Sequence, residues 1–286
     1  MRLHTYKNAQ SFLKANQHLL VDNEALTQLI IYNALQKLTV PSCNTCLFGT
    51  ITEGDQVILL FSNVTPYNLQ IFAPIEEKHL LQAAIKLLIK YLLDINIPVK
   101  GISGNSVICN NFITYYIKKS PSSIFKEYLR SDILELRDIH TINIPNGFFR
   151  QANLSDLDTI THWNVLFGND VLDLRLEYDR IIDMVKEQIN NNLYYIFFNT
   201  DDVPVSMASA TRKLLNGSSI SYVYTANNYR GHGYATAIMY HVSKSILEQG
   251  NQFCTLFVDK KNQVANRVYH KTGYRILAEN YDYYLT

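Results

Sequence analysis

The sequence predicts two α/β domains, each built on a mixed sheet with helices packed against it. Short runs of β-branched and aromatic residues alternate along the chain with segments of helical periodicity. The segment 142–147 (INIPNG) places a proline and an Asn-Gly turn between two patterned regions, which predicts domains at 1–144 and 145–286. A chain of 286 residues, 47% hydrophobic and 18% charged, is long enough for two medium-sized cores.

In the first domain, helices precede a group of short strands, and further helices and strands follow. The expected elements are helices at 9–20 and 25–38, strands at 46–51, 57–61 and 69–72, a helix at 76–93, a strand at 99–102, a helix at 106–118 and a strand at 133–136. The apolar residues of the helix at 76–93 form one stripe, so this helix is expected to cover the sheet. Gly101-x-x-Gly104 is interpreted as a turn, because it is followed by Asn105 and not by a cation.

In the second domain, a strand is followed by a capped helix and then by an antiparallel meander. The expected elements are a strand at 148–152, a helix through Trp163, strands at 194–198, 205–211 and 219–225, a helix that ends at Gly250, a strand at 253–258, a helix at 264–270 and a final strand at 281–285. Asn153 or Ser155 can cap the first of these helices. The turn residues at 199–202 and the pair Asn216-Gly217 predict two hairpins.

A glycine-rich loop, 229–236 (YRGHGYAT), joins the strand at 219–225 to the following helix. The start of a helix presents unpaired backbone N–H groups and the positive end of a dipole, and glycines let an anion approach this backbone closely. Arg230 adds a positive charge. The loop therefore predicts a pyrophosphate site made by the backbone of Gly231, His232, Gly233, Tyr234, Ala235 and Thr236.

A second ordered pattern follows this loop. It reads Asn262-x-x-Ala265-x-x-x-Tyr269-x-x-x-Gly273-Tyr274, after Arg230-x-x-Gly233-x-Ala235 in the loop itself. Together the two patterns resemble the acetyl-CoA signature of the GCN5-related N-acetyltransferase (GNAT) superfamily. A short Gly-x-Gly alone is common in turns before helices, so the pair is much more specific than either half.

The resemblance implies a fold, a cosubstrate and an activity. It implies the acyl-CoA N-acyltransferase-like fold for residues 145–286 and acetyl-CoA as cosubstrate. It also implies N-acetyltransferase activity, in which a primary amine of a small molecule or peptide attacks acetyl-CoA directly. The order of elements in 1–144 resembles a degenerate second copy of this fold in tandem, without its own cofactor motif. An unrelated α/β domain is the alternative for this half.

The resemblance also implies roles for particular residues. Val223 and Thr225 would offer strand backbone to the pantetheine arm, where this strand splays from the strand at 253–258. Asn262 would contact the cofactor amide or order a water, and helix capping is its alternative role. Tyr269 resembles the family's general acid, because a tyrosine of pKa near 10 stays protonated at neutral pH and can protonate a thiolate. Packing is its alternative role in a chain with 20 tyrosines.

The general base is left open by the sequence. The family often carries a Glu on the strand at 205–211, but this strand reads VSMASAT and has no carboxylate. A water chain on Ser209, Thr211 or Ser221, a carboxylate from the helical region, and His162 are the alternatives. The segment 151–200 has eight acidic and three basic residues, which either attract a cationic amine or form a solvated helix face.

Charge and composition exclude several other kinds of partner. A net charge of +1 creates no general field toward nucleic acid or anionic membranes. The N-terminus lacks the apolar run of a signal peptide, and Lys86 and Lys90 interrupt the most apolar segment, so a cytoplasmic protein without membrane partners is expected. Cys43-x-x-Cys46 has metal-knuckle spacing without further ligands nearby, so no metal is expected.

Two other functions fit parts of the sequence. A CoA-binding regulatory or interaction protein without transfer activity is favoured by the missing strand carboxylate. A nucleotide-phosphate binder of another fold is disfavoured, because the loop lacks both the Gly-Lys-Ser/Thr ending of a P-loop and an acidic ribose partner at the expected spacing.

Overall fold

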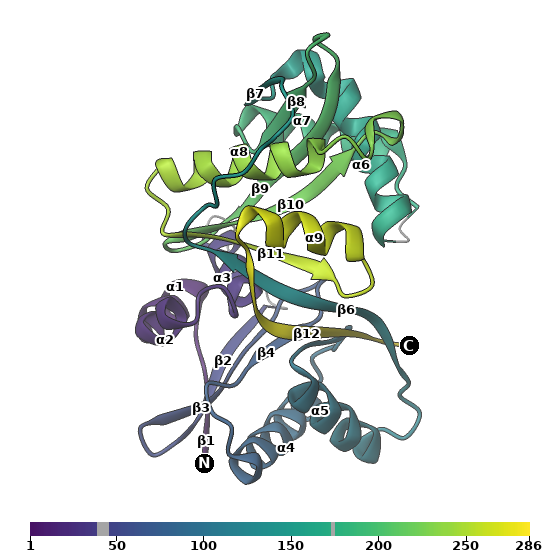
Figure 1. The fold of residues 1–286 in the computed structure, drawn as a ribbon. Coiled ribbons are helices and arrows are strands. Elements are labelled where there is room, and N and C mark those ends of the chain that lie inside the picture. Colours follow the sequence, from purple (N-terminus) through teal and green to yellow (C-terminus); the bar gives the residue numbers. More distant parts are fainter. Residues whose placement is uncertain (39–45, 173–174) are drawn as a thin grey trace. The chain divides into compact units, whose positions relative to one another are not determined.

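The computed structural model describes residues 1–38, 46–172 and 175–286 (Figure 1). It contains two compact units. Unit 1 comprises Met1–Ile133 together with Leu277–Thr286, and unit 2 comprises Leu134–Ile276. The division at 144/145 stays a prediction about where independently folding domains begin, which limited proteolysis can test.

Unit 1 is a mixed sheet with helices on both faces. Its elements are β1 (Arg2–Thr5), α1 (Ala9–Ala15), α2 (Gln17–Asp22), α3 (Gln28–Gln36), β2 (Leu47–Glu53), β3 (Gln56–Asn63), β4 (Leu69–Phe72), α4 (Lys78–Asp94), β5 (Gly101–Gly104), α5 (Ser106–Lys119) and the first part of β6 (Phe125–Leu136), with β12 (Arg275–Leu285) from the end of the chain. Neighbouring strands follow the order β1-β2-β3-β4-β5-β12, in which only β4 and β5 run parallel.

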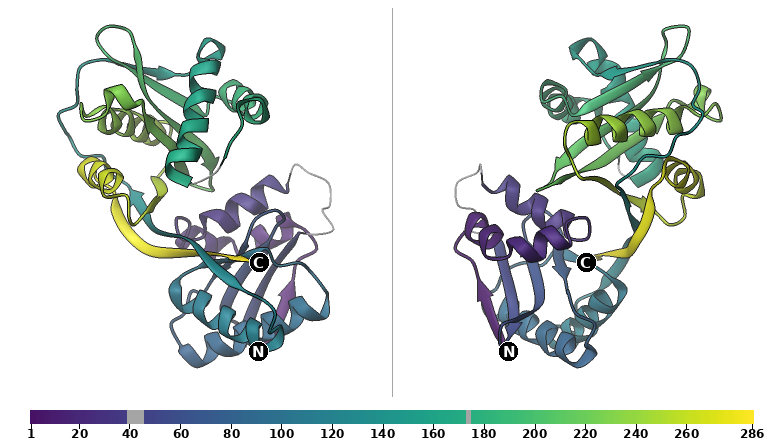
Figure 2. Two further views of the ribbon diagram at one scale, coloured as in Figure 1. Left: turned by 90° about the vertical axis from the view of Figure 1, so that its right-hand side faces the viewer. Right: turned by 60° about the vertical axis from the view of Figure 1, so that its left-hand side comes forward.

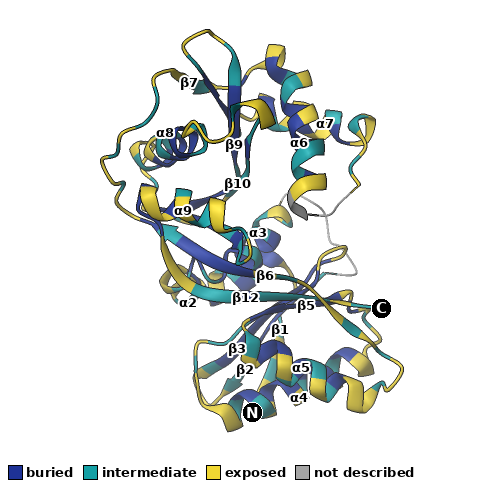
Figure 3. Ribbon diagram, turned by 45° about the vertical axis from the view of Figure 1, so that its right-hand side comes forward, coloured by how far each residue is buried: buried dark blue, intermediate teal, exposed yellow. Residues whose placement is uncertain are grey.

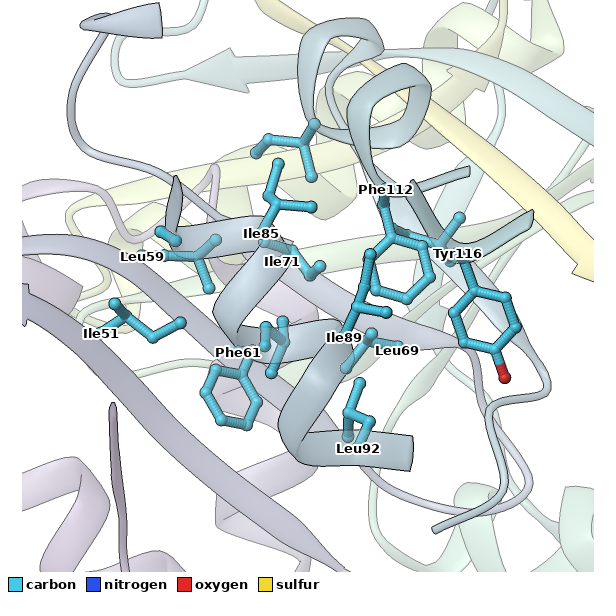
Figure 4. Close-up of a cluster of buried hydrophobic side chains, with 14 of the residues drawn as sticks. Ile51, Leu59, Phe61, Leu69, Ile71, Ile85, Ile89, Leu92, Phe112 and Tyr116 are labelled. Atoms are coloured by element: carbon cyan, nitrogen blue, oxygen red, sulfur yellow. The ribbon is translucent and has the colours of Figure 1, made fainter. Parts of the chain in front are cut away.

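The larger core of unit 1 lies between the sheet and the helices α4 and α5. The predicted stripe of α4 is confirmed, because its buried residues recur at helical spacing: Leu81, Ala84, Ile85, Leu88, Ile89 and Leu92. Figure 4 shows Ile85 and Ile89 of α4 beside Phe112 and Tyr116 of α5. Helices α1 to α3 cover the opposite face of this sheet (Figure 2).

Unit 2 also has strands of mixed direction, with a helix pair on each face. Its elements are β7 (Phe148–Gln151), the 3₁₀ turn η1 (Leu154–Asp156), α6 (Leu157–Leu172), α7 (Tyr178–Asn190), β8 (Tyr194–Phe198), β9 (Pro204–Lys213), β10 (Gly217–Thr225), the 3₁₀ turn η2 (Asn227–Tyr229), α8 (Tyr234–Glu248), β11 (Phe253–Asp259) and α9 (Gln263–Thr272). Strands follow the order β7-β8-β9-β10-β11-β6, and β10 and β11 run parallel. One core lies under α8 and α9 and another under α6 and α7 (Figure 3).

The two units share one topology. In each, the chain forms a strand, helices, three antiparallel strands, a helix, a strand parallel to the third one, and another helix. They differ at the start of the helix that follows the meander, where unit 1 has Glu76 and Glu77 and unit 2 has the glycine-rich loop. Carboxylates at a helix N-terminus repel an anion, so this position in unit 1 is unfavourable for a pyrophosphate.

The end of the chain completes unit 1, although the sequence suggested a final strand of the second domain. Tyr281–Tyr284 of β12 pair antiparallel with Gly104–Gly101 of β5. Gly101 and Gly104 therefore lie in a strand, and their interpretation as a turn was wrong. A Cβ at Gly101 would collide with the carbonyl oxygen of Tyr283 and with Asn68, so the close approach of β12 requires glycine there.

Candidate functional site

The central feature of unit 2 is that β10 and β11 separate along their length. They pair only from Gly217 with Phe253 to Ser219 with Thr255. From Ser219 to Tyr224 the pairing of β10 with β9 is irregular as well, and Tyr222 has a φ of 53°, which is unusual for a residue other than glycine. The second half of β10 is therefore free of β11, as the sequence led us to expect.

The glycine-rich loop places a row of unpaired N–H groups at the end of β10. Gly231 and Gly233 both have a φ of 84°, a conformation that L-residues other than glycine rarely adopt. Gly233 caps α8 without any side-chain hydrogen bond, and the first bond of the helix runs from Ala237 N–H to the Gly233 carbonyl. Among the described residues, the N–H groups from Gly231 to Thr236 have no acceptor, so they form an anion cradle.

Arg230 lies at this cradle and is held by three contacts. Its Nε donates to the carbonyl oxygen of Thr225 at 3.1 Å, and its Nη2 donates to Asp170 of α6 at 3.3 Å. The guanidinium also lies over the ring of Tyr224, 5.4 Å from its centroid. The cation that the sequence predicted at the cradle is thus paired with the carboxylate of Asp170, a side chain about half exposed to water.

The other residues of the loop brace its shape. His232 Nδ1 is 3.0 Å from the Arg230 carbonyl oxygen, and its ring stacks with that of Tyr234. Thr236 is buried at the start of α8, where it joins the helix to the core. Val223 of β10 packs against the core under α8 and lies beyond Ser219, where the pairing of β10 with β11 ends.

Helix α9 carries the second predicted pattern. The side chain of Asn262 accepts a hydrogen bond from Ala265 N–H at 3.0 Å and caps the helix, which was its alternative role. Gly273, with a φ of 111°, ends α9, and a Cβ there would meet Leu136 at 2.9 Å. Tyr274 follows and shares a 2.8 Å hydrogen bond with Ser243 of α8. Both caps fix the position of Tyr269 between them.

Tyr269 is buried in the core under α8, with 7% of its surface exposed. Its ring lies edge-on to that of Tyr274. Burial raises the pKa of Tyr269 well above its usual value of 10, so the phenol is protonated at neutral pH. Its hydroxyl has no hydrogen-bond partner among the described residues, so it is available to a bound ligand.

The splayed strands, the cradle and the buried tyrosine coincide with a sequence match. Residues 158–274 match the profile of the Acetyltransferase (GNAT) family. These residues form a GNAT-family domain. The matched range contains β10, the loop, α8 and α9 and ends at Tyr274. A search of curated protein sequences found no match to the chain.

Solved structures with the same fold match the chain over both units. A GNAT-family acetyltransferase from Colwellia psychrerythraea is 13% identical, with 100% of this chain and 99% of that chain covered and a TM-score of 0.55. A Drosophila protein is 10% identical, with 99% and 98% covered and a TM-score of 0.66. A GCN5-related N-acetyltransferase from Sphaerobacter thermophilus is 12% identical, with 92% of each chain covered and a TM-score of 0.58. At these identities the likeness shows the fold alone.

The face of the GNAT domain under α6 and α7 is aromatic. Trp163, Tyr194 and Tyr224 are buried there, and Phe167 and Tyr222 are partly buried against them. The hydroxyl of Tyr194 donates to Asn164 at 2.9 Å, which anchors α6 to the sheet. This aromatic cluster was not singled out by the sequence, because its members come from three separate elements, α6, β8 and β10.

The candidate bases of the GNAT domain are placed unequally. Ser209 is fully buried and its hydroxyl donates to the Leu193 carbonyl oxygen at 3.1 Å. Thr211 and Ser221 are partly exposed on β9 and β10, and His162 is exposed on α6. A buried hydroxyl that is already bonded is a poor site for a proton relay, so Thr211 and Ser221 are the better positioned of the hydroxyls.

Four of the eight acidic residues in 151–200 have local partners. Asp156 is buried and forms a two-pronged ion pair with Arg150, which holds the pKa of that carboxyl below its usual range against the effect of burial. Asp158 accepts from Tyr178, Glu177 pairs with Arg180, and Asp170 pairs with Arg230. Asp173 lies outside the described residues. The exposed acids of α7 form a solvated helix face.

Cysteines, metals and membranes add little to the site. Cys43 of the predicted metal knuckle lies outside the described residues, and Cys109 and Cys254 are buried thiols. Within the described ranges, no group of three His, Cys, Asp or Glu side chains is arranged to hold a metal ion. None of the helices described is long and apolar enough to span a membrane.

Proposed function

We propose that the chain is an N-acetyltransferase that moves an acetyl group from acetyl-CoA to a primary amine of a small molecule or peptide. The observation that carries this proposal is the row of N–H groups from Gly231 to Thr236, unpaired among the described residues, at the end of β10 and beyond the stretch in which β10 pairs with β11. A pyrophosphate offers the acceptors and the negative charge that this cradle lacks. The pantetheine arm would run along the free edge of β10, beside Val223 and Thr225.

Arg230 would change partners when the cofactor binds. Its guanidinium is paired with Asp170 and with the Thr225 carbonyl, which also belongs to the strand edge proposed for the pantetheine arm. A pyrophosphate is a stronger partner for a guanidinium than one exposed carboxylate. We therefore expect Arg230 to leave Asp170, which frees a carboxylate from the helical region at the rim of the site.

Direct attack of the amine on acetyl-CoA agrees with the protonated state of the buried Cys254 thiol. Burial raises the pKa of Cys254 to about 12, so it carries no thiolate to accept the acetyl group first. The amine nitrogen would attack the thioester carbonyl, form the N–C bond and lose one proton, while the C–S bond breaks and the sulfur takes up one proton. Acetyl-CoA supplies the activated acetyl group, and the protein supplies position and protons.

Tyr269 would hydrogen-bond to the departing sulfur. An ordinary tyrosine has a pKa near 10 and an ordinary thiol near 8.5, so full proton transfer to the thiolate is uphill by about 2 kcal/mol. Burial raises the pKa of Tyr269 further, which makes full proton transfer to a thiolate of ordinary pKa still less favourable. Tyr269 is thus suited to stabilise the developing thiolate by donation, with the proton moving as the C–S bond breaks.

The amine must lose its proton before it attacks. An alkyl amine of pKa near 10.4 is mostly protonated at pH 7, and holding it neutral costs about 4.6 kcal/mol. Asp170, once released by Arg230, and the exposed hydroxyls of Thr211 and Ser221 are our candidates for accepting that proton through water. Two single variants, Asp170→Asn and Thr211→Val, would separate them by their effect on the pH dependence of kcat.

The test combines binding and turnover. Calorimetric titration of the full chain with acetyl-CoA should give heat that Gly233→Ala weakens, and a panel of primary amines should give acetylated product with release of free CoA. Binding without transfer to any amine would instead favour the alternative, a CoA-binding regulatory protein. Absence of both binding and product would contradict the proposal.

A further inference from the structure

A lysine-rich groove lies on unit 1, and its residues lie outside the segment 158–274 in sequence. It runs between the C-terminal halves of α4 and α5 and has a volume of about 650 Å³. Figure 3 shows the outer surfaces of these two helices largely exposed. We call it the α4–α5 groove and define it by Lys86 and Lys90 of α4 and by Tyr115, Lys118 and Lys119 of α5. Its volume falls within the range of small-molecule sites, about 300–1,000 Å³.

The groove concentrates positive charge in a chain that is nearly neutral overall. Four lysines and one carboxylate, Asp94, line it, a net formal charge of +3, whereas the whole chain carries +1. Among the described residues, none of the four lysines forms an ion pair with a carboxylate. The two helix C-termini nearby contribute about −0.5 charge each, which reduces the positive charge without cancelling it.

An aromatic ring and aliphatic side chains line the groove beside its lysines. Lys86 Nζ lies 4.6 Å and Lys118 Nζ 5.5 Å from the ring centroid of Tyr115, so one ring gathers ammonium groups from both helices. Ile89 and Leu93 line the same space and add apolar surface. Apolar surface together with ammonium groups in one groove matches an anion that carries an apolar or aromatic body.

We propose that the α4–α5 groove binds a small organic polyphosphate, with two or more phosphate groups on an apolar or aromatic body. Ammonium groups bind phosphate as mobile point charges, and four of them around one groove match several phosphate charges better than a single carboxylate. No residue of the groove belongs to 158–274, so this site is separate in sequence from the proposed cofactor cradle.

The experiment titrates the full chain with ATP and, separately, with inorganic triphosphate. The test variant is Lys86→Ala combined with Lys118→Ala. The matched control is Lys78→Ala, an exposed lysine in the first turn of α4 and outside the groove. Arg230→Ala reports whether ATP uses the cradle of unit 2 instead. Melting temperatures of all variants confirm that each is folded.

The expected result is saturable ATP binding at low salt that the double variant weakens by about tenfold or more. Lys78→Ala should leave ATP binding unchanged, and in Arg230→Ala the ATP binding that depends on Lys86 and Lys118 should persist. Triphosphate should bind more weakly than ATP because it lacks a body to cover the apolar lining. Added salt should weaken the binding.

Three results would overturn the proposal. Equal ATP binding by the double variant and the unchanged protein would place the ligand elsewhere. Loss of ATP binding in Arg230→Ala alone would place it in the cradle. Binding of a single-stranded RNA oligomer without binding of ATP would show a nucleic-acid surface instead of a small-molecule site. Each of these leaves the acetyltransferase proposal intact, because that proposal rests on unit 2.

Discussion

Replacing Asp170 by Asn should tighten the binding of acetyl-CoA. In the structure Asp170 holds the Arg230 guanidinium at 3.3 Å, and the two side chains are 43% and 52% exposed. If Arg230 moves to the pyrophosphate, the ion pair with Asp170 must break first, and its free energy is subtracted from the free energy of binding. Asp170→Asn keeps the shape of the side chain and removes the charge that competes.

The magnitude follows from the geometry. Two unit charges 3.3 Å apart attract by about 1.3 kcal/mol in the dielectric of bulk water. Side-chain ordering reduces the net contribution of such exposed pairs to about 0.2–1 kcal/mol. The dissociation constant of acetyl-CoA should therefore fall by about 1.4- to 5-fold in Asp170→Asn. The effect should shrink as salt concentration rises, because salt weakens the pair.

Isothermal titration calorimetry on a double-mutant cycle is the assay. Asp170→Asn is measured in the unchanged protein and again in an Arg230→Ala background, where no guanidinium is left to compete for. The gain in affinity should largely disappear in that background. An equal gain in both would show that Asp170 acts only by repelling phosphate. A loss of affinity in Asp170→Asn would refute the exchange of partners at Arg230.

Four further predictions concern single features of the fold and site. Gly233→Ala should weaken acetyl-CoA binding by about five- to thirtyfold, because a φ of 84° strains a residue with a Cβ by about 1–2 kcal/mol; unchanged affinity by calorimetry would remove the cradle. Tyr269→Phe should lower kcat by about a hundredfold with little change in the KM for acetyl-CoA, and steady-state kinetics with an unchanged kcat would remove its role as acid. Burial lowers the pKa of His241, which stacks on Phe149 and Phe197, so the unfolded chain takes up a proton more readily than the folded one. The contribution of His241 to the free energy of unfolding is complete above its unfolded pKa of 6.5 and is lost as the pH falls below that value. Between about pH 7.5 and about pH 5.5, the melting temperature of His241→Phe should therefore drop less than that of the unchanged protein. Truncation after Ile276 should remove the strand paired with β5 and abolish the hydrogen-exchange protection of β5, whereas persistent protection would contradict the placement of β12.

Features set by a few neighbouring residues could be predicted from the sequence. The cradle depends on Gly231 and Gly233 adopting a positive φ before a helix, and the ends of α9 depend on Asn262 and Gly273. These are local backbone effects, so the residue types alone indicate them. The hairpins of unit 2 were predicted for the same reason, from the turn residues at 199–202 and at Asn216-Gly217.

Features that depend on distant partners could not be predicted. Gly101 lies in a strand because the C-terminal strand β12 approaches it, and no local signal marks that approach. The pair of Arg230 with Asp170 spans 60 positions, so both residues were noted without being connected. The helix expected at 9–20 breaks into α1 and α2, where the Asn16 side chain donates to the Phe12 carbonyl oxygen.

The most direct measurement is the rate of CoA release from acetyl-CoA in the presence of a panel of primary amines, with the products identified by mass spectrometry. We predict release that depends on an amine, saturates with acetyl-CoA, yields the N-acetylated amine in equal amount and is strongly reduced in Gly233→Ala. CoA release that is the same with and without every amine, and no acetylated product, would contradict the proposed acetyltransferase activity.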